Sequence, residues 1–237
     1  MAERLDKVLS SQNYGSRREI GSMAKRGRIT VNGQVAKDPA RKVEPEQDHI
    51  AVDGKTVSFQ RYVYYMLHKP AGVLSAARDA RAQTVLDLLP PDMRRRNLFP
   101  AGRLDKDTEG LLILTDDGDF AHRMLSPKKH IFKEYHAVLD KPIGSADIDA
   151  FAAGLALSDM TCLPAAVQVL EESDTPLVSI AICEGKFHQV KRMFAARGAT
   201  VTYLKRVRIG DLWLDETLEK GAARPLTEAE RNAIFAE

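Results

Sequence analysis

Two dipeptides near the N-terminus, Asn32-Gly33 and Asp53-Gly54, constrain the fold of the first part of the chain most strongly. Each stands between short apolar runs, RITV and QVA around the first and HIAV and KTV around the second. A two-residue type I′ turn needs positive φ angles at both of its positions, and Asn-Gly and Asp-Gly are the pairs that best tolerate them. The sequence therefore predicts two β-hairpins with their turns at these glycines.

Two short helices are expected before the hairpins. Residues 4–11 place Leu5, Val8 and Leu9 at helical spacing. Ser16 followed by Glu19 has the form of a capping box, which predicts a second helix from there to about residue 26. The helices and hairpins together predict a compact N-terminal domain of residues 1–58.

This N-terminal stretch is also basic. Residues 1–42 contain ten Lys/Arg and four Asp/Glu, whereas the whole chain has a formal net charge of only +2. Such an asymmetry indicates a basic module attached to a near-neutral body. Charge alone leaves two interpretations open, a surface that binds nucleic acid and an ordinary solvated surface.

The stretch RLDKVLSSQNYGSRREIGSMAKRGRITVNGQVAKDPARKV resembles the S4 RNA-binding domain over its whole length. The resemblance implies a basic helix face and hairpin that rest on structured RNA, because clustered Lys/Arg side chains neutralise phosphates. The candidate RNA contacts of this domain are Arg17, Arg18, Lys25 and Arg28.

Several classes of protein lack their usual signatures here. The sequence has no GxxxxGK[ST], no GxGxxG after a predicted strand and no HExxH, so nucleotide, dinucleotide and zinc-protease chemistry are disfavoured. Cys162 and Cys183 stand apart in apolar surroundings, which is typical of buried reduced thiols. The chain has no run of 18 apolar residues and begins with a charged segment. We therefore expect a soluble cytoplasmic protein without a metal, a cofactor or a membrane contact.

Strands and helices alternate irregularly through residues 62–237, without an internal repeat. This pattern predicts a large α+β domain with a mixed, mostly antiparallel sheet flanked by helices. The expected strands are residues 62–68 (followed by a turn at Lys69-Pro70), 111–118, 133–140, 177–183 and 200–214. The expected helices are a short one within residues 84–89 that Pro90-Pro91 end, residues 119–126, residues 147–157, and residues 187–197 with Gly198 past the end.

Three segments place polar side chains where strands end: GRLDKDTEG at 102–110, SPKKHIFKEYHAVL at 126–139 and EGKFHQVKRMFAARG at 184–198. Each has an ordinary explanation when it is taken alone. Acidic residues can cap a turn, a tyrosine on an alternating strand is usually half-buried, and basic residues usually form an exposed helix face.

In this order the three segments resemble the motifs of pseudouridine synthases, in the branch that carries an N-terminal S4 domain and acts on ribosomal RNA. The similarity runs from about residue 62 to residue 227, and the HQVKRM form is most similar to members acting on the small subunit. Members acting on the large subunit more often have an Asn-Arg pair before the basic stretch, where this chain has Phe187-His188. The resemblance implies isomerisation of a uridine in 16S rRNA, within a small-subunit assembly intermediate, by a monomer that needs no cofactor. A site in 23S rRNA is the alternative.

The resemblance also implies roles for individual residues. Asp105 is the reactive carboxylate, Lys191 is the cation that pairs with it, and Tyr135 stacks on a flipped-out uracil. Arg103 occupies the position that the base leaves or grips the flanking backbone. Asp107 and Glu109 are expected to be surface or turn residues. The other candidate phosphate contacts are Lys128, Lys129, His130, Lys133, Arg192 (also the fallback partner of Asp105) and the run Arg94-Arg95-Arg96. The arginine run fits a solvated helix end equally well.

Two further classes of function are compatible with parts of the sequence. A non-catalytic rRNA-binding assembly factor would explain the basic N-terminal module but not the ordered Asp, Tyr and Lys. A glycoside hydrolase would use carboxylates, but a convincing second catalytic carboxylate is missing and the RNA module would be unexplained.

Overall fold

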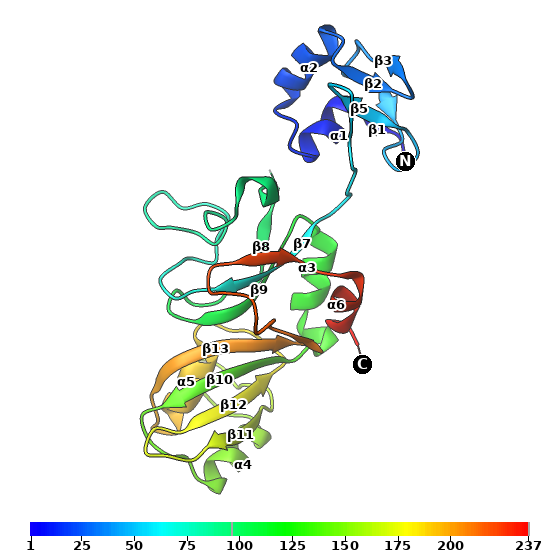
Figure 1. Ribbon diagram of the computed structural model, residues 1–237. Helices are drawn as coiled ribbons and strands as arrows, with labels where there is room; N and C mark the ends of the chain where they lie inside the picture. The colour runs from blue at the N-terminus through cyan, green and yellow to red at the C-terminus, as the bar shows by residue number, and fades with distance from the viewer. Residues whose placement is uncertain (96, 237) are drawn as a thin grey trace. The chain divides into compact units, whose positions relative to one another are not determined.

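The computed structural model describes residues 1–95 and 97–236, so Arg96 of the arginine run lies outside the described residues (Figure 1). The chain forms two compact units. Unit 1 contains Met1–Val63 and Pro90–Leu98, and unit 2 contains the chain from Tyr64 to Leu89 and from Phe99 onward. Helices and strands occur in both units, and the expected α+β class is confirmed. None of the helices in the described chain is long and apolar enough to cross a membrane.

Unit 1 consists of two helices and small antiparallel sheets, as the sequence predicts. A four-stranded sheet has the order β3-β2-β5-β6, and a two-stranded sheet joins β1 to β4. The elements are β1 (Glu3–Arg4), α1 (Leu5–Ser11), α2 (Arg17–Lys25), β2 (Ile29–Val31), β3 (Gln34–Val35), β4 (Lys42–Val43), β5 (Ile50–Val52), β6 (Lys55–Thr56) and the short 3₁₀ helix η1 (Pro91–Met93).

The local signals in unit 1 are confirmed. Asn32 and Gly33 have φ angles of 53° and 77°, and the next hairpin repeats this geometry at Asp53 and Gly54. The Ser16 side chain accepts a hydrogen bond from the backbone N–H of Glu19, and the Glu19 carboxylate accepts one from the Ser16 backbone. The capping box therefore begins α2 at the predicted position.

A buried carboxylate links the two helices of unit 1. Asp6 lies on α1 and accepts hydrogen bonds from Arg4 at 2.8 Å and from Arg17 at 3.0 Å. The hydrogen bond from Arg4 is the main cause that lowers the pKa of Asp6 to about 2, with a further contribution from Arg17. Arg17, a candidate RNA contact, is therefore also part of the unit's internal structure.

The sheet of unit 2 has the order β11-β12-β10-β13-β9-β7-β15, with β14 paired to β13 and β8 to β9. Among the described strand pairs, β9 and β13 are parallel and the others are antiparallel, which confirms the expected mixed sheet. The strands are β7 (Tyr64–Lys69), β8 (Phe99–Ala101), β9 (Glu109–Thr115), β10 (Lys133–Leu139), β11 (Ala166–Glu171), β12 (Leu177–Ile182), β13 (Val201–Ile209), β14 (Leu212–Trp213) and β15 (Ala223–Pro225).

Helices cover this sheet at several places (Figure 1). α4 contacts β11 and α5 contacts β13, and the buried rings of Phe151 and Phe194 join these two helices with their centroids 4.9 Å apart. The helices are α3 (Gly118–Leu125), η2 (Pro127–Lys129), α4 (Ser145–Ala153), α5 (Gln189–Ala196) and α6 (Glu228–Ala233).

The parallel pairing of β9 with β13 explains the glycine that ends the first motif. Gly110 has a φ angle of 106°, and a Cβ atom built there would lie 2.1 Å from the backbone oxygen of Arg206. Any other residue would push the two strands apart. Gly110 therefore allows the loop before β9 to lie beside β13.

Two predicted helices differ from the structure. Residues 85–88 form turns instead of a helix, because the Asp87 carboxylate accepts hydrogen bonds from the backbone and hydroxyl of Thr84, and Pro90-Pro91 lack backbone donors. The helix expected at 147–157 ends at Ala153. Cys162 and Cys183 are buried and unpaired, as expected.

Replacing Asp6 with asparagine is expected to destabilise unit 1 by about 1–2 kcal/mol at pH 7, because Arg4 and Arg17 lose their shared counter-ion. The folded-state pKa of Asp6 lies below its unfolded value, so its stabilising contribution is present above about pH 4 and is lost as pH falls toward 2. Urea denaturation at pH 7 and pH 3 measures this. Equal differences between wild type and Asp6→Asn at both pH values would contradict the assignment.

Candidate active site

The three polar segments meet in one cleft of unit 2. Loop 102–108, strands β10, β12 and β13, and the segment that leads into and begins α5 all contribute to its lining. The lining side chains include Arg103, Asp105, Thr108, Tyr135, Ile182, Lys186, His188, Val190, Lys191 and Leu204. Residues that are far apart in the sequence are thus brought together as the motif order implied.

Asp105 faces two cationic or potentially cationic groups in this cleft. Its side chain is 25% exposed, and its carboxylate oxygens lie 3.7 Å from Lys191 Nζ and 3.7 Å from His188 Nε2. These separations are longer than hydrogen bonds, so the attraction is electrostatic. His188 was noted in the sequence only as a departure from related motifs, and its place beside Asp105 was missed.

Lys191 is shared between two carboxylates. Its Nζ donates a hydrogen bond of 2.6 Å to Asp107, which is closer than its 3.7 Å approach to Asp105. This hydrogen bond lowers the pKa of the Asp107 carboxyl group. Asp107 is 73% exposed, as expected of a surface residue, but it is also the nearer partner of Lys191.

Glu109 differs from the expectation of a surface or turn residue. It lies on β9 and is buried, and its carboxylate accepts a hydrogen bond of 2.8 Å from the Tyr203 hydroxyl and pairs with Lys220 at 2.7 Å. The acidic spacing of the loop could not show that the strand had already begun at this residue.

Lys69, at the end of β7, holds the loop that carries Asp105. Its side chain is fully buried, and its ammonium group donates to the backbone oxygens of Pro70, Asp105, Lys106 and Thr108 at 2.9–3.2 Å. Burial lowers the pKa of Lys69 to about 8, although the nearby carboxylates oppose this shift. Lys69 was expected only as part of a Lys-Pro turn after this strand, so its role as an anchor was missed.

Tyr135 is buried on β10, between β12 and β13, and two buried cations lie beside it. The Arg206 guanidinium carbon lies 6.0 Å from the centre of the tyrosine ring, and Arg206 Nε donates to the Leu111 carbonyl at 2.8 Å. Its Nη2 is buried without a hydrogen-bond partner among the described residues. Two buried basic side chains therefore lie near the tyrosine.

Lys133, which was expected to contact phosphate, is the second of these buried cations. The residue is 5% exposed, and its Nζ approaches the Cys183 carbonyl at 3.5 Å. Burial lowers the pKa of Lys133 to about 8, and the charge of Arg206 adds to the shift. Lys133 and Tyr135 lie two residues apart on one strand, so they share the inward face.

The remaining candidate RNA contacts fall into two groups. Some are exposed and have no ion pair within residues 1–95 and 97–236: Arg18, Lys25, Arg103, Lys128 and Lys129. The others are held by the protein itself. Arg28 pairs with Asp53 at 2.5 Å, Arg192 pairs with Asp159, and Arg95 donates to the carbonyls of Ser11 and Gln60. Arg192 therefore pairs with Asp159 and not with Asp105.

In the described part of the chain, no group of three or more His, Cys, Asp and Glu side chains is placed to hold a metal ion. The cleft instead combines one partly exposed carboxylate, a lysine, a histidine and a buried aromatic ring. This set can stabilise positive charge on one part of a substrate while a flat ring stacks on the tyrosine.

Residues 63–196 match the model of a family described as RNA pseudouridylate synthase, and residues 3–50 match the S4 domain. An RNA pseudouridine synthase from Bacillus subtilis (strain 168) is 44% identical over 98% of both chains. Ribosomal small subunit pseudouridine synthase A is 42% identical in Vibrio cholerae, over 98% of this chain and 99% of that protein. The same enzyme from Escherichia coli (strain K12) is 40% identical over 96% and 97%. A crystal structure of a pseudouridylate synthase is 35% identical and superposes with a TM-score of 0.68, over 98% and 99% of the two chains.

Replacing Lys69 with methionine is expected to loosen residues 105–108, because several buried carbonyls lose their donor at about 1–3 kcal/mol each. In the wild-type protein the Lys69 ammonium group is charged at pH 7 and loses its proton, and with it the charge, as pH rises through about 8. Amide NMR signals of residues 106–108 should therefore report a titration near pH 8 in wild type but not in Lys69→Met.

The matched control for this titration is Lys133→Met, since Lys133 has a similarly lowered pKa but does not contact the loop. This variant should keep the loop's midpoint near pH 8. Loss of the midpoint in Lys133→Met, with retention in Lys69→Met, would show that Lys69 does not hold the loop.

Proposed function

The chain belongs to the RNA pseudouridylate synthase family and carries an S4 domain, and from this premise we propose that it isomerises a specific uridine in small-subunit (16S) ribosomal RNA, with Asp105 as the reactive carboxylate. Relatives named for the small ribosomal subunit, at 40–42% identity over nearly the whole chain, support the choice of RNA. A site in 23S rRNA is the alternative substrate.

The proposal for Asp105 rests on one observation: this carboxylate shares a cleft with Tyr135, Lys191 and His188. Formation of pseudouridine breaks the N1–C1′ bond and forms a C5–C1′ bond. N1 gains a proton, and C5 loses one. The reaction is a net isomerisation, so the enzyme must supply charge stabilisation and proton transfer without an external oxidant or group donor.

Positive charge develops on the sugar when the glycosidic bond breaks, and a carboxylate can stabilise that charge, attack the carbon or remove a proton from the sugar. Lys191 Nζ and His188 Nε2 each lie 3.7 Å from an oxygen of Asp105, so the carboxylate has these groups nearby without a direct hydrogen bond to either. Both carboxylate oxygens of Asp105 are therefore left able to approach a substrate.

Tyr135 offers a flat ring on a rigid strand, on which a detached uracil can turn without leaving the cleft. The target base must first leave its stack, at a cost of a few kcal/mol. Arg103 is exposed at the rim of the same cleft, where it can contact the flanking backbone or fill the vacated position. The buried charges of Arg206 and Lys133 favour negative charge on a base held against Tyr135.

Unit 1 supplies a separate surface for RNA. Arg18 and Lys25 are exposed on α2, whereas Arg17 and Arg28 are partly neutralised by Asp6 and Asp53. Contacts of this kind bind phosphates and add affinity with little sequence information. We propose that this surface anchors a monomeric enzyme on an rRNA assembly intermediate, while unit 2 selects the uridine.

Asp105→Asn is expected to reduce the rate of pseudouridine formation by about a thousandfold or more, because the reacting charge is removed while the shape is kept. Binding of RNA should change by no more than about twofold. Release of tritium from a 16S transcript that contains 5-tritiated uridine measures the rate, because the C5 hydrogen leaves as the new bond forms.

Asp107→Asn is the matched control, since it removes the neighbouring carboxylate that also contacts Lys191. It should retain most of the activity. Wild-type activity in Asp105→Asn together with an inactive Asp107→Asn would transfer the proposed role to Asp107.

A further inference from the structure

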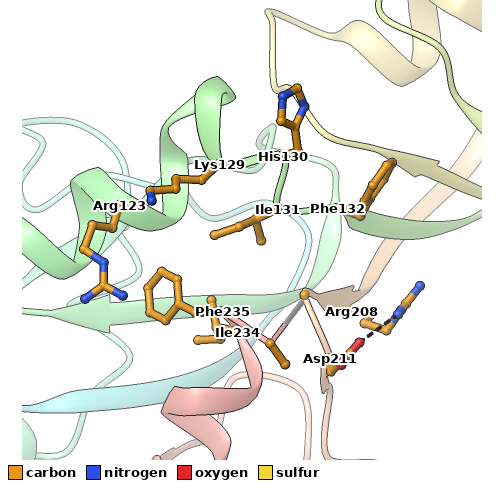
Figure 2. A pocket seen from close by; sticks show the side chains of 11 residues that line it. Arg123, Lys129, His130, Ile131, Phe132, Arg208, Asp211, Ile234 and Phe235 are labelled. Carbon is orange, nitrogen blue, oxygen red and sulfur yellow. Dashed lines mark hydrogen bonds and ion pairs between the residues drawn. The ribbon is translucent and has the colours of Figure 1, made fainter.

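A second cavity in unit 2, of about 530 Å³, plays no part in the site described above (Figure 2). Its walls come from α3, the segment around η2, the end of β13 and the residues after α6. Figure 2 shows Arg123, Lys129 and His130 along one side, Arg208 and Asp211 on the other, and apolar side chains between them.

The base of this cavity is apolar. Ile131 and Ile234 are buried, and the Phe235 ring lies beside them. Phe132 is 45% exposed, although it directly precedes a strand that is buried at every other residue. Trp213 is 54% exposed, and the centre of its ring lies 5.1 Å from the guanidinium carbon of Arg208, which lines the cavity. Two large aromatic rings are thus presented to solvent at one end of the sheet.

The rim of the cavity has an excess of positive charge. The guanidinium carbon of Arg123 lies 4.3 Å from the centre of the Phe235 ring. Neither Arg123 nor Lys129 has an ion-pair partner in the described part of the chain. Arg208 is neutralised by Glu134 at 2.8 Å, and Asp211 is the acidic residue of the lining. Two uncompensated cations therefore flank an apolar floor.

We propose that this cavity is a second RNA-binding site, which holds the strand that flanks the target uridine. One base stacks on Phe132, and the adjoining phosphate binds between Lys129 and Arg123. The inference rests on the proposed function and goes beyond it, because it assigns a separate subsite for the neighbouring nucleotides. Exposed aromatic rings among lysine and arginine side chains are the combination that binds single-stranded nucleic acid, since every base has a face for stacking.

The position of the cavity supports a flanking strand over an unrelated ligand. Phe132 precedes Tyr135 by three residues, about 10 Å of nearly extended chain, and this odd spacing directs the two side chains to opposite faces of the sheet. A few nucleotides can span this distance. An RNA strand whose uridine is turned toward Tyr135 can reach Phe132 by passing around the end of the sheet at which β10 begins. An acidic segment of a partner protein would satisfy the cations but would leave the stacking surfaces unused.

Phe132→Ala and Lys129→Ala test the proposal in the full-length protein, since both side chains are exposed and neither holds the core. Each variant should weaken binding of an unmodified 16S rRNA transcript, by about tenfold for the stacking ring. Lys129→Ala should also reduce the slope of log affinity against log salt by about one, and Phe132→Ala should leave that slope unchanged. Ultraviolet cross-linking followed by mass spectrometry should map RNA to the peptide that contains Phe132.

Lys141→Ala and Leu170→Ala are the matched controls, because they remove an exposed lysine and an exposed apolar side chain elsewhere on unit 2. Both should bind the transcript as wild type does. The proposal would be overturned if both cavity variants kept wild-type affinity and salt slope and no cross-link appeared at residues 129–132. It would also be overturned if an acidic peptide bound there while RNA did not. Binding is measured apart from turnover. Failure of the wild-type protein to form pseudouridine would instead count against the proposed function.

Discussion

The loop that carries Asp105 depends on one buried ammonium group. Lys69 donates to four backbone oxygens, and three of them belong to the segment from Asp105 to Thr108. Burying an unpaired cation costs free energy. Hydrogen bonds from the ammonium group to the surrounding carbonyl oxygens offset that cost and fix the positions of those carbonyls. Gly110 then lets the backbone continue directly into β9 against β13. The place of Asp105 is therefore set by its backbone, and its side chain remains available for a substrate.

The charges around the cleft are unequally compensated. Lys191 Nζ lies 3.7 Å from Asp105 and 2.6 Å from Asp107. The proposed reactive carboxylate therefore has a cation nearby but is not its close ion-pair partner. Near Tyr135, Arg206 and Lys133 are buried with carbonyl partners and no carboxylate among the described residues. A substrate that gains negative charge on its base and positive charge on its sugar would be stabilised at both ends.

The sequence predicted what is determined locally. The two hairpins, the capping box at Ser16 and the alternation of β10 depend on neighbouring residues, and each was found where expected. Long-range partners were harder to predict. The helix expected after Thr84 was replaced by a turn through Asp87, and Lys191 lies closest to a carboxylate 84 residues away. Lys133 carried a usable signal, because it shares the inward face of β10 with Tyr135 and so had to be buried with it.

The central claim is that three distant segments form one site that converts a uridine of small-subunit rRNA to pseudouridine. Mapping pseudouridine across all rRNA, in cells with the gene deleted and in the same cells complemented with wild type or Asp105→Asn, tests it most directly. The account predicts that deletion removes one modification in 16S rRNA, that wild type restores it and that Asp105→Asn does not. A deletion strain that keeps every pseudouridine, or loses one only from 23S rRNA, would contradict the account.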